Sequence, residues 1–249
     1  MTSIKSLLLL FPRTSYGARR YNQRLRREIE EHPDRALMVW ERENSSQLWY
    51  VFHGMAGALQ MQPLTVLRET GLIHTNLILL KDYYRFCYHA GLNREITDVD
   101  AIIARLRRCR EELSHVRQTF CFGTSVGGYA AILFGHYLQV DVVCAFGPAT
   151  LINLDVLKKF GGCKDVWRIT EQHRDLARLL AKHNGRTRYK IFYCDGYGTD
   201  RTYAERLQGL PGVELYPQPG NTHNVVQAMY ESGRLREIFA TVPSGPTVK

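Results

Sequence analysis

The sequence predicts an α/β protein with a single doubly wound, mostly parallel sheet that carries helices on both faces. Three observations lead to this prediction. Apolar, β-rich runs recur along the whole chain, and helical patterns lie between them. Several of these runs are almost continuously apolar, as expected of strands buried on both faces. Strands that alternate with helices favour parallel pairing, because each helix carries the chain back across the sheet.

Length and composition agree with this fold class. The chain has 249 residues, of which 45% are hydrophobic and 23% are charged. It is long enough to bury a large core without disulfides, so we expect one domain over residues 1–249. The composition excludes a disordered tail, a collagen-like repeat and a disulfide miniprotein. The longest purely apolar run is Leu7–Phe11, well below the roughly 20 residues of a membrane span.

The run Leu7–Phe11 is also too short for a signal peptide, and Pro12 interrupts it, so we expect a short edge strand there. Apolar and β-branched residues predict seven further strands. In chain order they are Ala36–Trp40, Leu48–Phe52, Asn76–Leu80, Thr119–Phe122, Asp141–Phe146, Arg188–Cys194 and Val213–Pro217.

Helices are expected where apolar residues recur three and four positions apart. Asp98–Leu113 shows this spacing in Val99, Ile102, Ile103 and Leu106. Small and apolar residues favour a buried helix directly after the fourth of the seven strands. The expected helices span Asp98–Leu113, Gly127–Leu138, Glu171–His183, Ala204–Leu207 and Val225–Phe239.

The net charge indicates which classes of partner the protein can bind. Thirty-three basic and 24 acidic residues give a formal net charge of +9, with the densest patches at Arg19–Arg27 and Arg105–Arg110. No aromatic platform or known module accompanies them, so we expect solvated helix faces or an acidic protein partner, and not nucleic acid.

The six cysteines show no C-x-x-C spacing, which argues against a zinc site. Without a secretion signal we expect reduced thiols and a cytoplasmic protein.

The most informative segment is Gly123–Gly127, which reads G-x-S-x-G. It directly follows an expected strand and opens an expected helix, the context of a nucleophile elbow. Side chains at positions 123 and 127 would collide with the neighbouring strand and helix. Ser125 is therefore the candidate nucleophile. The backbone N–H of Val126, at the helix N-terminus, can stabilise a developing oxyanion.

With this motif the sequence resembles the α/β-hydrolase superfamily, from about Ala36 to Phe239. GTSVGGYAAILFG, together with the upstream FHGM, is similar to a branch of small bacterial serine hydrolases. The resemblance implies a chain order of serine, acid and histidine. It implies no metal and no organic cofactor.

The remaining site residues follow from that order. His223 lies between the last strand and the last helix, where a loop can bring a base to Ser125. Asp200 is the favoured acid because it precedes a helix, and Asp195, at the strand end, is the alternative. The resemblance implicates the N–H of Met55, or of Ala56 in a longer loop, as the second oxyanion donor. His53 would then hold this loop by hydrogen bonds.

Two segments are candidates for substrate binding. Residues 151–168 leave room for a small lid with an apolar face, although packing of a short helix on the sheet explains the same pattern. Tyr83, Tyr84 and Arg85 follow the strand Asn76–Leu80, on the same edge of the sheet as the candidate triad. They are candidate substrate contacts, and a solvated aromatic loop is the alternative.

The sequence as a whole predicts a serine hydrolase that acts on an ester or thioester through an acyl-enzyme. The substrate is a small molecule or a carrier-bound acyl group. Because acyl carrier proteins are usually acidic, the net charge of +9 favours a thioesterase or acyltransferase as a narrower hypothesis. The alternative is a non-catalytic binding protein that retains the fold.

Overall fold

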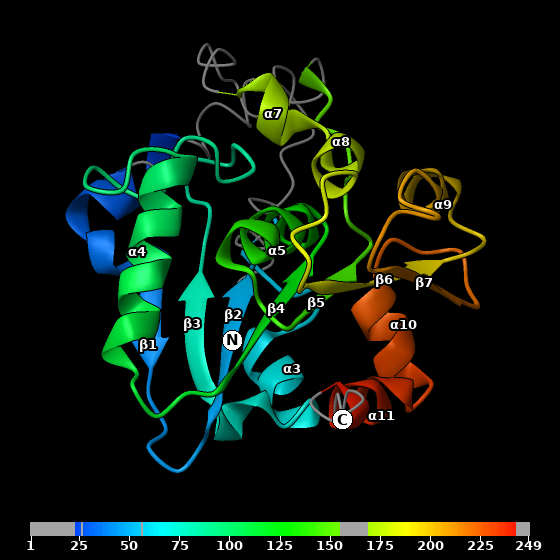
Figure 1. Ribbon diagram of the computed structural model, residues 1–249, viewed down its shortest axis with the longest axis horizontal. Helices are drawn as coiled ribbons and strands as arrows, with labels where there is room; N and C mark the ends of the chain where they lie inside the picture. The colour runs from blue at the N-terminus through cyan, green and yellow to red at the C-terminus, as the bar shows by residue number, and fades with distance from the viewer. Residues whose placement is uncertain (1–22, 26, 56, 155–168, 243–249) are drawn as a thin grey trace.

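The computed structural model describes residues 23–25, 27–55, 57–154 and 169–242 (Figure 1). Its centre is a seven-stranded sheet in the order β1-β3-β2-β4-β5-β6-β7. Only β1 runs antiparallel to its neighbour, and all other adjacent strands are parallel. The strands are β1 (Leu37–Trp40), β2 (Gln47–Phe52), β3 (Asn76–Leu80), β4 (Gln118–Thr124), β5 (Val142–Phe146), β6 (Arg188–Cys194) and β7 (Val213–Gln218).

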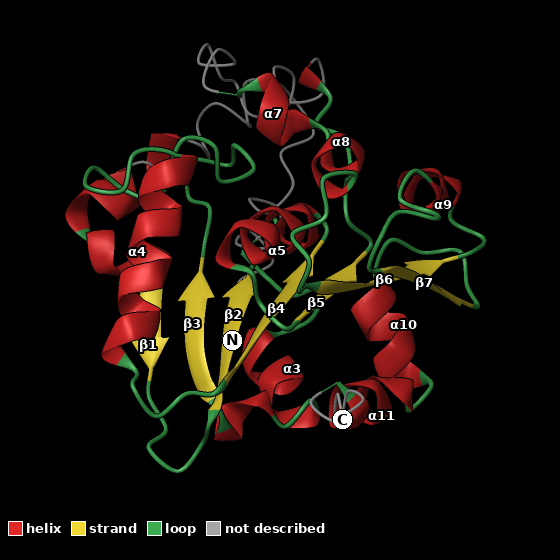
Figure 2. Cartoon of the chain, in the orientation of Figure 1, coloured by secondary structure: helices red, strands yellow, loops and turns green. Residues whose placement is uncertain are grey.

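Helices cover both faces of this sheet, so the predicted doubly wound α/β class is confirmed (Figure 2). One face carries α4 (Val99–Glu112), α5 (Val126–Leu138), α8 (Leu176–Leu180) and α9 (Gly198–Glu205). The other carries α3 (Pro63–Glu69), α10 (Val225–Glu231) and α11 (Arg234–Thr241). Short elements complete the set: η1 (Pro33–Ala36), η2 (Leu72–His74) and α7 (Glu171–Arg174).

Successive side chains along each strand point to opposite faces of the sheet, so the core has two layers, one on each face. Tyr50 and Phe52 of β2 pack under α5, whereas Trp49 and Val51 pack on the opposite face. All of these side chains are at most 1% exposed. The near-continuous apolar runs in the sequence therefore reflect strands that bury both faces.

The helices differ from the prediction in three places. The expected helix Glu171–His183 is broken at Asp175, whose extended backbone lets its carboxylate cap α8 by accepting from the Ala177 N–H. The expected helix Val225–Phe239 is divided at Gly233, which adopts a left-handed φ of +76°. The short helix α3 was not expected, and α9 begins six residues before the predicted Ala204.

Some predictions fall outside the described residues. These are the edge strand Leu7–Phe11, most of the Arg19–Arg27 patch, and residues 155–168 of the expected lid segment. No helix in the described part of the chain is long and apolar enough to cross a membrane. The five cysteines that the structure describes are all free and buried.

Helix α11 packs against the sheet through a cluster of aromatic side chains. The ring of Phe239 lies 5.4 Å from Trp49, 5.2 Å from Phe122 and 6.0 Å from Phe146, measured between ring centroids. Phe239 is 3% exposed. Through these contacts with side chains of three strands, Phe239 anchors α11 to the sheet.

We expect Phe239→Ala to lower the free energy of unfolding by about 3–5 kcal/mol, because it removes a buried ring and leaves a cavity between α11 and the sheet. Urea unfolding followed by circular dichroism measures the change. Tyr230→Ala on α10 is the control, because Tyr230 is 41% exposed. Equal effects of the two substitutions would contradict the anchoring role.

Candidate active site

The candidate site lies at the carboxyl edge of the sheet, where β4 turns into α5. Ser125 occupies this turn with φ +55° and ψ −120°, a conformation that side-chain-bearing residues rarely adopt. Its N–H donates a hydrogen bond of 2.8 Å to the carbonyl of Phe146 at the end of β5. The turn is therefore tied to the neighbouring strand, and this bond helps to hold the strained backbone in place.

Two glycines make the turn possible. A Cβ atom at Gly123 would lie 2.0 Å from the carbonyl oxygen of Gly127. A Cβ atom at Gly127 would lie 2.1 Å from the carbonyl oxygen of Phe52 in β2. Both distances are shorter than any real contact of this kind, so the backbone packs too closely for a side chain at either position.

A continuous chain of hydrogen bonds joins the three residues predicted as a triad. Nε2 of His223 lies 2.9 Å from Oγ of Ser125. Nδ1 of His223 lies 2.9 Å and 2.8 Å from the two carboxylate oxygens of Asp200. Because an ionised carboxylate only accepts, we assign the imidazole proton to Nδ1, which leaves Nε2 to accept from the serine hydroxyl.

The two candidate acids have different surroundings. Asp200 is 2% exposed, lies in the first turn of α9 and contacts His223 directly. Asp195 is exposed after β6, and the structure gives it no contact with His223. The geometry therefore places Asp200, and not Asp195, next to the histidine.

Sequence reasoning missed two residues that shape this arrangement. Gly147 follows β5 with φ +54°, and a Cβ atom there would lie 2.7 Å from Oδ2 of Asp200. Gln60 donates through its side-chain amide to the carbonyl of His223 and accepts from the N–H of Val226 at 3.0 Å. Gly147 had a sequence signal, since it ends a buried run before Pro148. Gln60 had none, because its partners lie more than 160 positions away.

The candidate oxyanion donors lie on two different segments. Val126 is the first residue of α5, and Met55 lies in the loop after β2. Neither N–H has a hydrogen-bond partner among the described residues. The N-terminus of α5 also favours negative charge nearby. Ala56, the alternative donor, lies outside the described residues.

His53 holds the loop that carries Met55. It is 2% exposed, and its Nδ1 donates to the carbonyl of Leu80 at 2.9 Å. The hydroxyl of Tyr88 donates to the carbonyls of both His53 and Leu80, at 2.9 Å and 3.1 Å. Burial lowers the pKa of His53 to about 4, so the ring is neutral near pH 7.

A cavity of about 210 Å³ lies beside the Met55 loop. Of the three predicted substrate contacts, Tyr83 lines this cavity, Tyr84 is half-buried against the core, and Arg85 is 7% exposed with φ +56°. The full lining is Leu25, Glu28, Met55, Gly57, Lys81, Asp82 and Tyr83.

Comparison with solved structures identifies the fold. No family model and no curated protein matches the chain. Among solved structures it is similar to Est1E from Butyrivibrio proteoclasticus, with TM-score 0.57 and 13% identity over 84% of this chain and 94% of that one. It is also similar to FphF, a fluorophosphonate-binding serine hydrolase of Staphylococcus aureus, with TM-score 0.55 and 14% identity over 82% and 91%. The chain therefore has the α/β-hydrolase fold.

We expect His53 to make stability depend on pH. Its folded pKa is about 4 and its ordinary value is 6.5, so between these values the unfolded state binds a proton that the folded state does not. The stabilising contribution is complete above pH 6.5 and is lost as pH falls toward 4, by about 3 kcal/mol.

Chemical denaturation at a series of pH values measures this contribution. His53→Gln should flatten the loss of stability between pH 6.5 and pH 4, whereas His74→Gln, at an exposed histidine of η2, should leave it unchanged. An identical pH profile for wild type and His53→Gln would contradict the role of His53.

Proposed function

We propose that this protein is a serine hydrolase that cleaves carboxylic esters, with Ser125 as nucleophile, His223 as general base and Asp200 as the orienting acid. One observation supports the proposal above all others. A serine on a strained turn is hydrogen-bonded to a histidine, which is hydrogen-bonded to a buried carboxylate. This combination can activate a hydroxyl group that is otherwise a weak nucleophile.

In the first half of the proposed reaction, Oγ of Ser125 attacks the ester carbonyl carbon while Nε2 of His223 takes the hydroxyl proton. Asp200 stabilises the resulting imidazolium. The carbonyl oxygen becomes an oxyanion, which the N–H groups of Val126 and Met55 stabilise. When the intermediate collapses, the carbon–oxygen bond to the alcohol breaks, and His223 donates its proton to that alcohol.

The second half releases the acyl group. His223, now neutral, takes a proton from water as the water oxygen attacks the acyl-enzyme. The second tetrahedral intermediate collapses, the carboxylic acid leaves, and the proton returns from His223 to Ser125. The enzyme is regenerated with no net change in its protonation.

The cavity beside Met55 suits a small substrate with a polar group. Glu28, Lys81 and Asp82 bring charge to its wall, and Tyr83 adds a ring. Thioesterase or acyltransferase chemistry uses the same triad and differs in the leaving group or the acceptor. A net charge of +9 supports a carrier-bound thioester as a narrower form of the proposal.

We expect a fluorophosphonate probe to add once to the wild-type protein and not to Ser125→Ala or His223→Ala, because phosphonylation requires an activated serine. Intact-mass spectrometry counts the adducts, and circular dichroism verifies that the variants fold. The wild type should then hydrolyse esters or thioesters in a screen of varied acyl length. A folded wild type that forms no adduct would refute the proposal and favour a binding protein that retains the fold.

We expect Asp200→Asn to lower kcat/KM by two orders of magnitude or more, because the amide can hold the imidazole in the wrong tautomer and cannot stabilise its cation. Asp195→Asn is the matched control: the same change in an exposed aspartate five residues earlier should leave kcat/KM within about twofold. Initial rates on one ester at fixed pH compare the two variants. The reverse order of effects would identify Asp195 as the acid.

A further inference from the structure

A second pocket, of about 210 Å³, lies at the opposite end of β4 and α5 from Ser125. β4 begins at Gln118 beside the pocket and ends at Thr124 before the serine, and α5 returns from Ser125 to Leu138 in the pocket wall. The pocket is therefore separate from the candidate active site. Its lining is Tyr50, Arg107, Arg110, Glu111, Arg117, Thr119, Leu138, Gln139 and Arg186.

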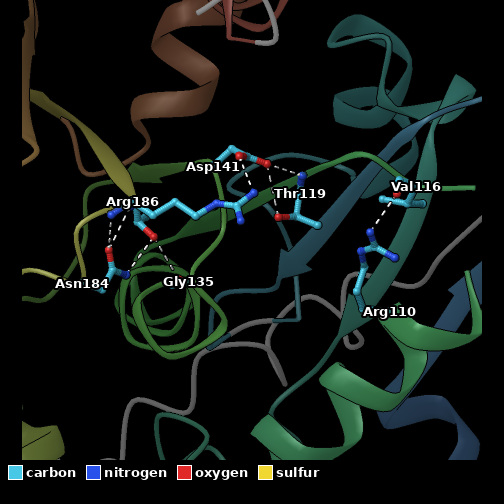
Figure 3. A network of polar contacts seen from close by, with 8 residues as sticks. Arg110, Val116, Thr119, Gly135, Asp141, Asn184 and Arg186 are labelled. Carbon is cyan, nitrogen blue, oxygen red and sulfur yellow. Dashed lines mark hydrogen bonds and ion pairs between the residues drawn. The ribbon is translucent and has the colours of Figure 1, made fainter. Parts of the chain in front are cut away.

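Four arginines from three segments of the chain line this pocket. Arg107 and Arg110 come from α4, within the basic patch Arg105–Arg110. Arg117 immediately precedes β4, and Arg186 lies two residues before β6. Figure 3 shows Arg186 extending toward Asp141 and Thr119, with Arg110 beyond Thr119. Separate segments of the chain thus bring their guanidinium groups to one place.

Backbone carbonyls position most of these guanidinium groups without neutralising them. Arg110 donates to the carbonyls of Leu113 and Val116, at 3.1 Å and 2.7 Å. Arg107 donates to the carbonyl of Tyr137 at 3.0 Å, and Arg117 donates to that of Ser114 at 3.0 Å. The arginines are thus held in place while they keep their charge.

Carboxylates offset only part of this charge. Asp141 forms an ion pair of 2.7 Å with Arg186. Asp141 also accepts from the N–H of Thr119 at 2.8 Å, and Glu111 lies in the pocket wall. Two carboxylates face four guanidinium groups, so the pocket carries an excess of positive charge.

Tyr50 adds a neutral hydrogen-bond donor to the lining of the pocket. It is 1% exposed and lies in the middle of β2, yet it lines the pocket. Its hydroxyl has no hydrogen-bond partner among the described residues. An acceptor atom of a ligand in the pocket could take this hydrogen bond.

We propose that this pocket binds a phosphate group. A phosphate group presents several charged oxygens in tetrahedral directions and can accept from guanidinium groups on different sides, whereas a planar carboxylate offers only two oxygens. Tyr50 donates to one further oxygen. The pocket volume suits a phosphate or diphosphate, either free or as the end of a small organic phosphate such as a nucleoside diphosphate.

Isothermal titration calorimetry at constant ionic strength tests the proposal, with inorganic phosphate, pyrophosphate and ADP as separate probes. We expect one saturable site per chain for at least one probe. Comparable affinity for pyrophosphate and ADP indicates a site for the phosphates alone, and tighter binding of ADP indicates a nucleotide. The absence of saturable binding by all three probes overturns the proposal.

Matched variants separate the pocket from general electrostatic attraction. Arg107→Gln and Arg117→Gln should each weaken binding at least tenfold. Arg108→Gln removes the same charge from the same helix, but Arg108 pairs with Glu112, is 74% exposed and does not line the pocket. The affinity of the Arg108→Gln variant for the probe should therefore stay within twofold of the wild-type value. Equal losses in Arg107→Gln and Arg108→Gln would overturn the proposal.

Two further variants examine the Tyr50 hydroxyl and the relation of the pocket to the candidate active site. Tyr50→Phe removes only the hydroxyl and should weaken binding several-fold without lowering the melting temperature. An unchanged affinity in Tyr50→Phe would overturn the assigned contact. Ser125→Ala should bind the probes as the wild type does, because Ser125 lies at the other end of β4. The result for the pocket is thus independent of ester hydrolysis.

Discussion

The structure depends on how closely the backbone packs at the turn between β4 and α5. Gly123 and Gly127 allow carbonyl oxygens to lie where side chains would otherwise stand, so the turn can be tight enough to raise Ser125 above the sheet edge. The same turn contacts β2 through Gly127 and β5 through the Ser125 N–H. The central strands, the central helix and the candidate nucleophile are therefore positioned by one local constraint.

His223 lies in a loop and Asp200 lies in the first turn of α9, and the positions of both side chains depend on specific contacts. Asp200 is almost fully buried, and a carboxylate in that position is tolerated because His223 and the first turn of α9 offset the loss of water. Gln60 holds the histidine loop by hydrogen bonds to the backbone of His223 and Val226, and Gly147 leaves room for the side chains of Asp200 and His223. The geometry at this edge of the sheet thus depends on contacts with residues from distant segments of the chain.

Much of this could be predicted from the sequence, because the responsible signals are local. Buried parallel strands appear as apolar runs, and the strand–turn–helix context of Gly123–Gly127 identifies the elbow. The helix break at Asp175 was missed, because the apolar spacing continues through it. The Asp175 side chain caps the start of α8, and the spacing of apolar residues does not reveal this cap. Gln60 and the convergence of Arg107 with Arg186 depend on contacts between distant segments, and no local pattern encodes such contacts.

The burial of the cysteines has a consequence for the protein's reactivity. Desolvation raises the pKa of all five described thiols, at positions 87, 109, 121, 144 and 194. A thiol reacts with electrophiles and peroxides through its thiolate, which burial disfavours and also shields. Within the described part of the chain, electrophiles and peroxides therefore find no exposed thiol, and we expect these five cysteines to resist modification while the protein is folded.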